Sequence, residues 1–129
     1  MTEEPEWLTT EDVLEAHTRQ LRIFGGASGI RDKGGLESAL GRPVNKWRYE
    51  SAELPELAAA YAFAIVRNHP FVDGNKRMAL ATCLVFLSEN GLLQNEELDV
   101  DAWENLTLAV ASSLLSRDEI AATLRKLLE

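Results

Sequence analysis

Apolar residues recur every three or four positions along most of this chain, which is the spacing of one face of an α-helix. The first such stretch, residues 10–24, follows Thr9, a residue type that caps helix N-termini, and is ended by Gly25-Gly26. No stretch alternates convincingly between apolar and polar residues with a period of two. The pattern therefore predicts an all-α protein.

Two buried helices are predicted in the middle of the chain, on either side of a polar turn. Residues 58–66 are apolar nearly all round, which is typical of a central helix. Pro70 ends this helix, because the residue before a proline is driven out of the helical region. The second central helix is predicted from about Asn75 to Asn90, with Gly91 just past its end.

Shorter patterns complete the predicted fold. Residues 27–35 are rich in glycine and charge and predict a loop, followed by a short helix from Leu36 to Leu40 that ends at Gly41-Arg42-Pro43. Two amphipathic helices, with capping boxes that begin at Asp101 and Ser116, finish the chain. Together these elements predict a single domain over residues 1–129, an all-α bundle of about six helices.

Charge and cysteine content narrow the class of protein. Acidic residues outnumber basic ones by 21 to 13, which argues against non-specific nucleic-acid binding but is compatible with one nucleotide in a local basic pocket. The single cysteine, Cys83, lies in a ten-residue apolar run and is interpreted as a small core residue. That run is too short to span a bilayer, which needs about 20 apolar residues. With an acidic N-terminus unlike a signal peptide, we expect a cytoplasmic protein without membrane contact.

The turn between the central helices, residues 69–77, carries most of the candidate chemistry and is called the motif segment below. Gly74 and Asn75 lie where the second helix begins, and the free N–H groups and the dipole at a helix N-terminus favour an anion there. Lys76 and Arg77 add positive charge, and Arg77 can hold two oxygens of a phosphate at once.

His69 and Asp73 extend this anion site toward catalysis. A Mg²⁺ ion held by Asp73 would remove its repulsion from a phosphate, and His69 could take a proton from an attacking hydroxyl. The end of a helix favours the charged imidazolium, so the surroundings of His69 would have to compensate. Each residue alone has a structural explanation as a helix end, a turn, a cap or a solvated charge. Together they favour an enzyme that handles a nucleotide, and the residues alone do not choose the transferred group.

The motif segment, His69-Pro70-Phe71-Val72-Asp73-Gly74-Asn75-Lys76-Arg77, resembles the signature of the Fic/Doc family and is very close to its death-on-curing form. A second block in residues 29–43 also resembles that family. The resemblance implies an all-α fold with the motif between two central helices. By position it implies a general base at His69, an apolar anchor of the loop at Phe71, a magnesium ligand at Asp73, an anion-binding turn at Gly74 and Asn75, and a phosphate-binding arginine at Arg77.

Two departures from the commoner Fic pattern bear on the reaction. Lys76 stands where adenylyl-transferring members have glycine, and Leu80 stands where they have a second arginine. In the death-on-curing branch the lysine goes with protein kinase activity on elongation factor Tu. The resemblance thus implies a toxin that phosphorylates a Ser or Thr hydroxyl of that factor with ATP and Mg²⁺. The alternatives are a Fic-type nucleotidyl transferase and a catalytically silent binding module.

Regulation by a separate antitoxin follows from the same resemblance. Many Fic proteins carry an inhibitory helix with Ser or Thr, three residues, Glu, then Gly or Asn. At the two nearest matches Val85 and Val100 occupy the hydroxyl position. We therefore expect a partner whose disordered tail folds as a helix in a groove of this protein. Outside the motif, His17 is interpreted as a core or boundary histidine, and Arg31 as part of a structural ion pair or of the border of the site.

Overall fold

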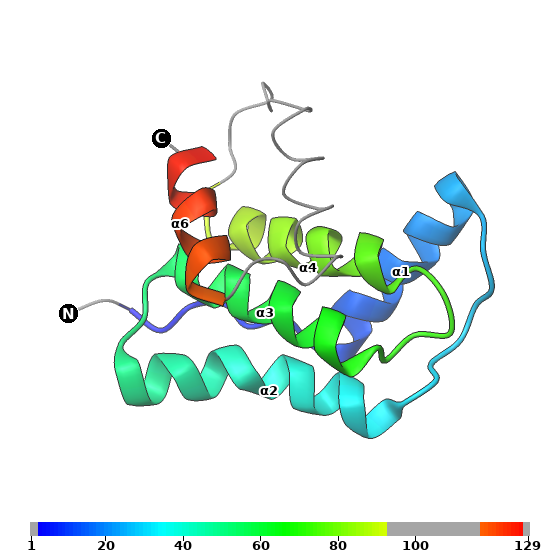
Figure 1. Ribbon diagram of the computed structural model, residues 1–129, viewed down its shortest axis with the longest axis horizontal. Coiled ribbons are helices and arrows are strands. Elements are labelled where there is room, and N and C mark those ends of the chain that lie inside the picture. Colours follow the sequence, from blue (N-terminus) through cyan, green and yellow to red (C-terminus); the bar gives the residue numbers. More distant parts are fainter. Residues whose placement is uncertain (1–2, 93–116, 128–129) are drawn as a thin grey trace.

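A computed structural model describes residues 3–92 and 117–127 of the chain. These residues form the helices α1 (Thr10–Phe24), α2 (Lys33–Glu50), α3 (Leu54–Asn68), α4 (Asn75–Glu89) and α6 (Arg117–Leu127) (Figure 1). This part of the chain contains no strand, and its one β-type contact is an isolated antiparallel bridge between Ile30 and Phe71. The all-α prediction is confirmed. The helix predicted after Asp101 and the cap at Ser116 lie outside the described residues.

Helix α3 is the centre of the structure. It packs against α2, α4 and α6, while α1 contacts α4 and α2 (Figure 1). Its buried residues surround most of the helix and include five alanines, whose small side chains allow neighbouring helices to approach closely. The prediction of two buried central helices is confirmed by α3 and α4. Among the described residues, no helix is long and apolar enough to cross a membrane.

Helix α2 corrects the prediction of a short helix at residues 36–40. It begins after the N-cap Asp32 and continues through Pro43 to Glu50. A proline inside a helix costs about 3 kcal/mol, because it removes one hydrogen bond and crowds the preceding turn. The cost is offset by packing: the buried residues of α2 form one continuous helical stripe against α3, made of Leu36, Ala39, Leu40, Pro43 and Lys46. The sequence predicted a helix end from Pro43, because the value of the buried stripe depends on α3 and is not visible in the local pattern.

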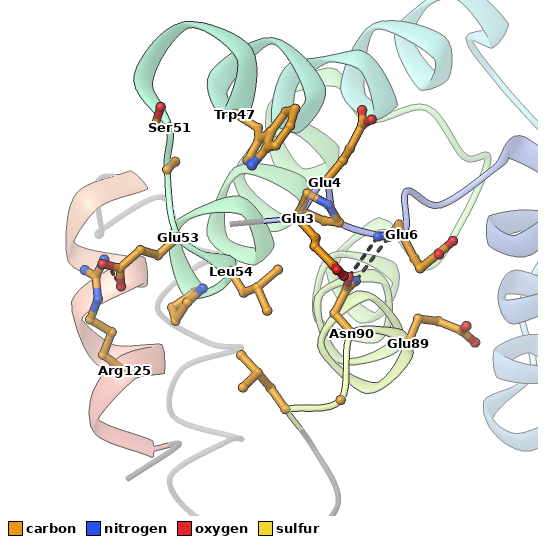
Figure 2. A pocket seen from close by; sticks show the side chains of 15 residues that line it. Glu3, Glu4, Glu6, Trp47, Ser51, Glu53, Leu54, Glu89, Asn90 and Arg125 are labelled. Atoms are coloured by element: carbon orange, nitrogen blue, oxygen red, sulfur yellow. Dashed lines mark hydrogen bonds and ion pairs between the residues drawn. The ribbon is translucent and has the colours of Figure 1, made fainter. Parts of the chain in front are cut away.

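A cavity of about 950 Å³ lies beside the C-terminal ends of α2 and α4 and the start of α3. Figure 2 shows Trp47 and Leu54 at this cavity, with Asn90 joined to the backbone of Glu6 by two hydrogen bonds. No residue of the motif segment lines the cavity. It occupies the end of the α3–α4 pair that is far from the turn between them.

Cys83 and Tyr61 are buried titratable groups of the core. Burial raises the pKa of the Cys83 thiol to about 12, and burial, more than any other cause, raises the pKa of Tyr61 to about 12. The Tyr61 hydroxyl also accepts a hydrogen bond from the backbone N–H of Leu8 at 3.2 Å. Because the thiol stays protonated and is 1% exposed, Cys83 is a core residue, as predicted, and not a nucleophile.

We predict that the protein loses stability in alkali through these two groups. Below about pH 9, which is the ordinary pKa of the thiol and lies under that of the phenol, both groups are protonated in the folded and in the unfolded protein, and stability does not depend on them. As the pH rises from about 9 to about 12, the unfolded chain releases the protons of both groups while the folded core retains them, so the free energy of unfolding falls. Urea titrations at several pH values should show this slope, and Cys83→Ala should reduce it to the part due to Tyr61. An unchanged slope would contradict the account.

Candidate active site

The motif segment connects α3 to α4 with two residues in the left-handed region. His69 is the C-cap of α3 with φ 47°, and Gly74 is the N-cap of α4 with φ 79°. Only glycine adopts this conformation without cost, so His69 must be held there by its surroundings. The turn is therefore shaped by what its residues contact.

Backbone hydrogen bonds join the middle of the motif segment to the loop before α2. The backbone N–H groups of Arg31 and Asp32 donate to the carbonyl of Pro70 at 2.7 and 3.0 Å, and the N–H of Val72 donates to the carbonyl of Gly29 at 3.1 Å. Phe71 is fully buried and stacks on the ring of His17 with 4.2 Å between ring centroids. Phe71 thus lies where the resemblance put an apolar anchor of the loop.

The side chain of Asn75 closes the turn from inside. Its Oδ1 accepts the N–H of Phe71 at 2.9 Å, and its Nδ2 donates to the carbonyl of Phe71 at 2.9 Å. Only 7% of Asn75 is exposed. Its amide is therefore committed to the loop, and only its backbone N–H remains for an anion. The sequence had suggested a phosphate-binding turn at Gly74 and Asn75 without this division of roles.

The second hydrogen of the Asn75 amide points at His69, with 3.2 Å between Nδ2 and Nδ1. Because Phe71 fixes which end of the amide is the donor, Nδ1 of His69 must be the acceptor, and the ring in this contact is neutral. The carbonyls that end α3 are satisfied by Arg31 instead, whose guanidinium donates to the carbonyl of His69 at 2.9 and 2.6 Å and to that of Asn68 at 3.3 Å. Arg31 and Asn75 thus supply the polar partners of the backbone and of the ring at the end of α3.

Asp73 lies on the exposed side of the turn, and its position is set by the segment after α1. Its Oδ2 accepts the N–H of Ala27 at 3.2 Å, and its Oδ1 accepts the N–H of Gly74 at 2.8 Å. A Cβ on Gly26 would lie 2.7 Å from Oδ2, so a glycine is needed for this approach. The backbone carbonyl of Asp73 accepts a hydrogen bond from Nε2 of the buried His17 at 3.0 Å.

The residues present fit a magnesium ion bound together with a nucleotide. No group of three metal-binding side chains occurs among the described residues, so the structure offers no all-protein cage there. Mg²⁺ commonly uses one or two carboxylates plus phosphates and waters. Asp73 offers such a carboxylate: it is exposed, and each oxygen accepts one backbone hydrogen bond, which leaves a lone pair on each.

The first turn of α4 presents unpaired positive groups. The first backbone hydrogen bond of this helix joins the N–H of Met78 to the carbonyl of Gly74, so the N–H groups of residues 75–77 have no such partner in the described structure. The side chains of Lys76 and Arg77 are exposed and make no ion pair or hydrogen bond with the residues described. The guanidinium of Arg77 lies over the ring of Phe24, 4.5 Å from its centroid. The first turn of α4 thus carries three N–H groups and two exposed cationic side chains that have no hydrogen-bond or ion-pair partner among the described residues.

Sequence reasoning missed most of the residues that support this site. His17 is buried, as predicted, but its hydrogen bond to Asp73 was not foreseen. Arg31 makes no ion pair in the described part of the chain and instead caps α3. The contact between Phe24 and Arg77 is likewise not predicted by the sequence pattern. One signal was present: His17 and Phe24 are seven residues apart, which places them on one face of a helix.

The comparisons with known proteins identify the family. The profile of the Fic/DOC family matches residues 7–87, which include the whole motif segment. The chain is 34% identical over 121 residues to "Protein kinase doc" of Escherichia phage P1, covering 93% of this chain and 94% of that protein. It is 41% identical over 122 residues to "Toxin Doc" of Mycolicibacterium smegmatis, covering 92% and 91%. The protein belongs to the Fic/DOC family.

We predict that Asn75→Ala destabilises the fold by roughly 1–3 kcal/mol, because it leaves the N–H and carbonyl of the buried Phe71 without partners. Urea unfolding measures the loss. Lys76→Ala is the matched control: its side chain is exposed and unpaired, so stability should change by less than about 0.5 kcal/mol. Equal stability of the two variants would show that the Asn75 amide does not hold the turn.

Proposed function

We propose that this protein is the toxin of a toxin–antitoxin pair and acts as a protein kinase. It transfers the terminal phosphate of ATP to a Ser or Thr hydroxyl of a translation factor, elongation factor Tu, and so inhibits translation. The observation that carries the proposal is the start of α4, where three free N–H groups and the cations of Lys76 and Arg77 lie beside a neutral histidine and an exposed carboxylate. The name of the phage P1 relative, a protein kinase, supports the same chemistry.

Each part of the site has a role in phosphoryl transfer, which depends mainly on positioning and on charge stabilisation. The helix N-terminus, Lys76 and Arg77 bind the phosphates and stabilise negative charge on the transferred group. Mg²⁺, held by Asp73, supplies further charge neutralisation when bound.

His69 orients the target hydroxyl and accepts its proton. In the contact with Asn75 the lone pair of the neutral ring is on Nδ1. A hydroxyl that gives its proton to His69 must therefore replace Asn75 at this nitrogen. His69 is exposed, which leaves the ring open to an approaching protein substrate.

The alternative within the family is transfer of a nucleotidyl group. Lys76 and Leu80 favour phosphate: Lys76 fills the position where a glycine would leave room, and Leu80 cannot bind the phosphates that a second arginine would hold. Leu80 is part of the helix face that packs against the core. The second alternative is a binding module without catalysis, against which the intact His69, Asp73 and Arg77 count.

Cellular context is part of the proposal. The relative from Mycolicibacterium smegmatis is named a toxin of the Doc type. Because the chain lacks the sequence pattern of an inhibitory helix, we infer restraint by a cognate antitoxin whose disordered tail folds on binding. The protein then acts in the cytoplasm, where its target and ATP occur.

Labelled ATP distinguishes the two transfer reactions. We predict that purified protein moves label from the γ position of ATP to elongation factor Tu and none from the α position. With the γ-labelled donor, the ADP that is released should carry no label. Retention of α label on the target would overturn the kinase proposal in favour of nucleotidyl transfer.

Substituting His69 tests whether catalysis causes toxicity. We predict that His69→Ala abolishes growth inhibition on expression and lowers the transfer rate by at least about a hundredfold, the contribution typical of general base catalysis. The fold should survive, because the His69 side chain is exposed. Full toxicity of this variant would favour the binding module.

A further inference from the structure

Phe24, the last residue of α1, makes a contact with the site that the proposed roles leave unexplained. Phe24 is 56% exposed, and the guanidinium carbon of Arg77 lies 4.5 Å from the centroid of its ring. With no hydrogen bond or ion pair to the described residues, the Arg77 side chain has this ring as its recorded partner. We propose that Phe24 is a positioning residue that holds Arg77 ready for a phosphate. The inference rests on the proposed function.

The chain on both sides of Phe24 is held relative to the motif segment. Two helical turns before Phe24, His17 donates to the backbone carbonyl of Asp73 and stacks on Phe71. Three residues after it, the N–H of Ala27 donates to the Asp73 carboxylate. The end of α1 is therefore tied to the turn on both sides of Phe24. The ring is therefore carried by a part of the chain that keeps its position relative to the start of α4, where Arg77 lies.

The chemistry of the contact suits a phosphate ligand. An aromatic ring attracts a guanidinium through the negative face of its π-system, without using the N–H donors. Those donors lie along the edge of the planar group, where they bind oxygen atoms in pairs. A hydrogen-bonded carboxylate would instead consume the donors and cancel the charge. The ring thus restrains the long, flexible side chain of Arg77 and leaves its donors available for a phosphate. This restraint lowers the conformational entropy that Arg77 loses when the phosphate binds.

The neighbouring residue provides a matched control. Ile23 is also apolar and, at 69%, even more exposed, but it has no aromatic face to offer a cation. Because an exposed apolar residue contributes little to stability, neither Phe24→Leu nor Ile23→Ala should unfold the protein. The midpoint of thermal unfolding of each variant checks this.

The test is a double-mutant cycle read by calorimetric binding of ATP with Mg²⁺. We expect Phe24→Leu to raise the Kd about two- to fivefold, the range for an exposed cation–π contact. Phe24→Tyr, which keeps the ring, and Ile23→Ala should bind like the unmodified protein. In an Arg77→Gln background, Phe24→Leu should have no further effect, because there is no guanidinium left to position.

Each other outcome overturns the inference in a recognisable way. An unchanged Kd in Phe24→Leu shows that the ring does not position Arg77, and a lower Kd shows that it holds Arg77 away from the phosphate. An equal loss in both backgrounds assigns Phe24 a general structural role. If the unmodified protein binds no ATP, the proposed function itself fails. This result is distinct from a series in which all variants bind ATP with the same Kd, which overturns only the role of Phe24.

Discussion

The hydrogen bonds between the Asn75 side chain and the backbone of Phe71 are the interaction on which the site depends. They pair the backbone N–H and the backbone carbonyl of Phe71, which is buried and has no other backbone hydrogen bond in the turn. They also begin α4 at a fixed point, since Asn75 is its first residue. The third contact of the same amide, with Nδ1 of His69, places the histidine relative to that helix start. Before a substrate binds, the same side chain thus connects the proposed base to the start of α4, where the proposed phosphate site lies.

The second wall of the site comes from the segment between α1 and α2. Backbone groups from Ala27 to Asp32 bind the motif segment at Asp73, Val72 and Pro70. Arg31 donates hydrogen bonds to the carbonyls of Asn68 and His69 at the end of α3. This arrangement leaves the two cations of α4 without acidic partners in the described structure, although the whole chain has a net charge of −8. Local geometry, and not overall charge, makes the site attractive to an anion.

Much of this architecture could be predicted from the sequence where local signals are strong. The N-cap at Thr9, the end of α3 shortly before Pro70 and the start of α4 are encoded within a few residues. Helix α2 could not be predicted, because the stripe that outweighs Pro43 gains its value only against α3.

The candidate site divides in the same way. The residue types of the motif segment predict a site that handles a nucleotide, and the family resemblance implies a role for each residue. The cap at Arg31 and the ring of Phe24 join positions 38 and 53 residues apart and depend on where α1 and the loop before α2 pack, whereas the Asn75 amide meets Phe71 only four residues earlier. No local pattern encodes which partner such a side chain will meet.

The central claim is that the start of α4, and not the cavity at the other end of the α3–α4 pair, binds the nucleotide. Amide chemical shifts recorded by NMR during titration with ATP and Mg²⁺ test it directly. The account predicts the largest shifts at Gly74, Lys76 and Arg77, with little change at Ser51 and Asn90, which line the cavity. Shifts concentrated at Ser51 and Asn90, with the amides of residues 74–77 unmoved, would contradict it.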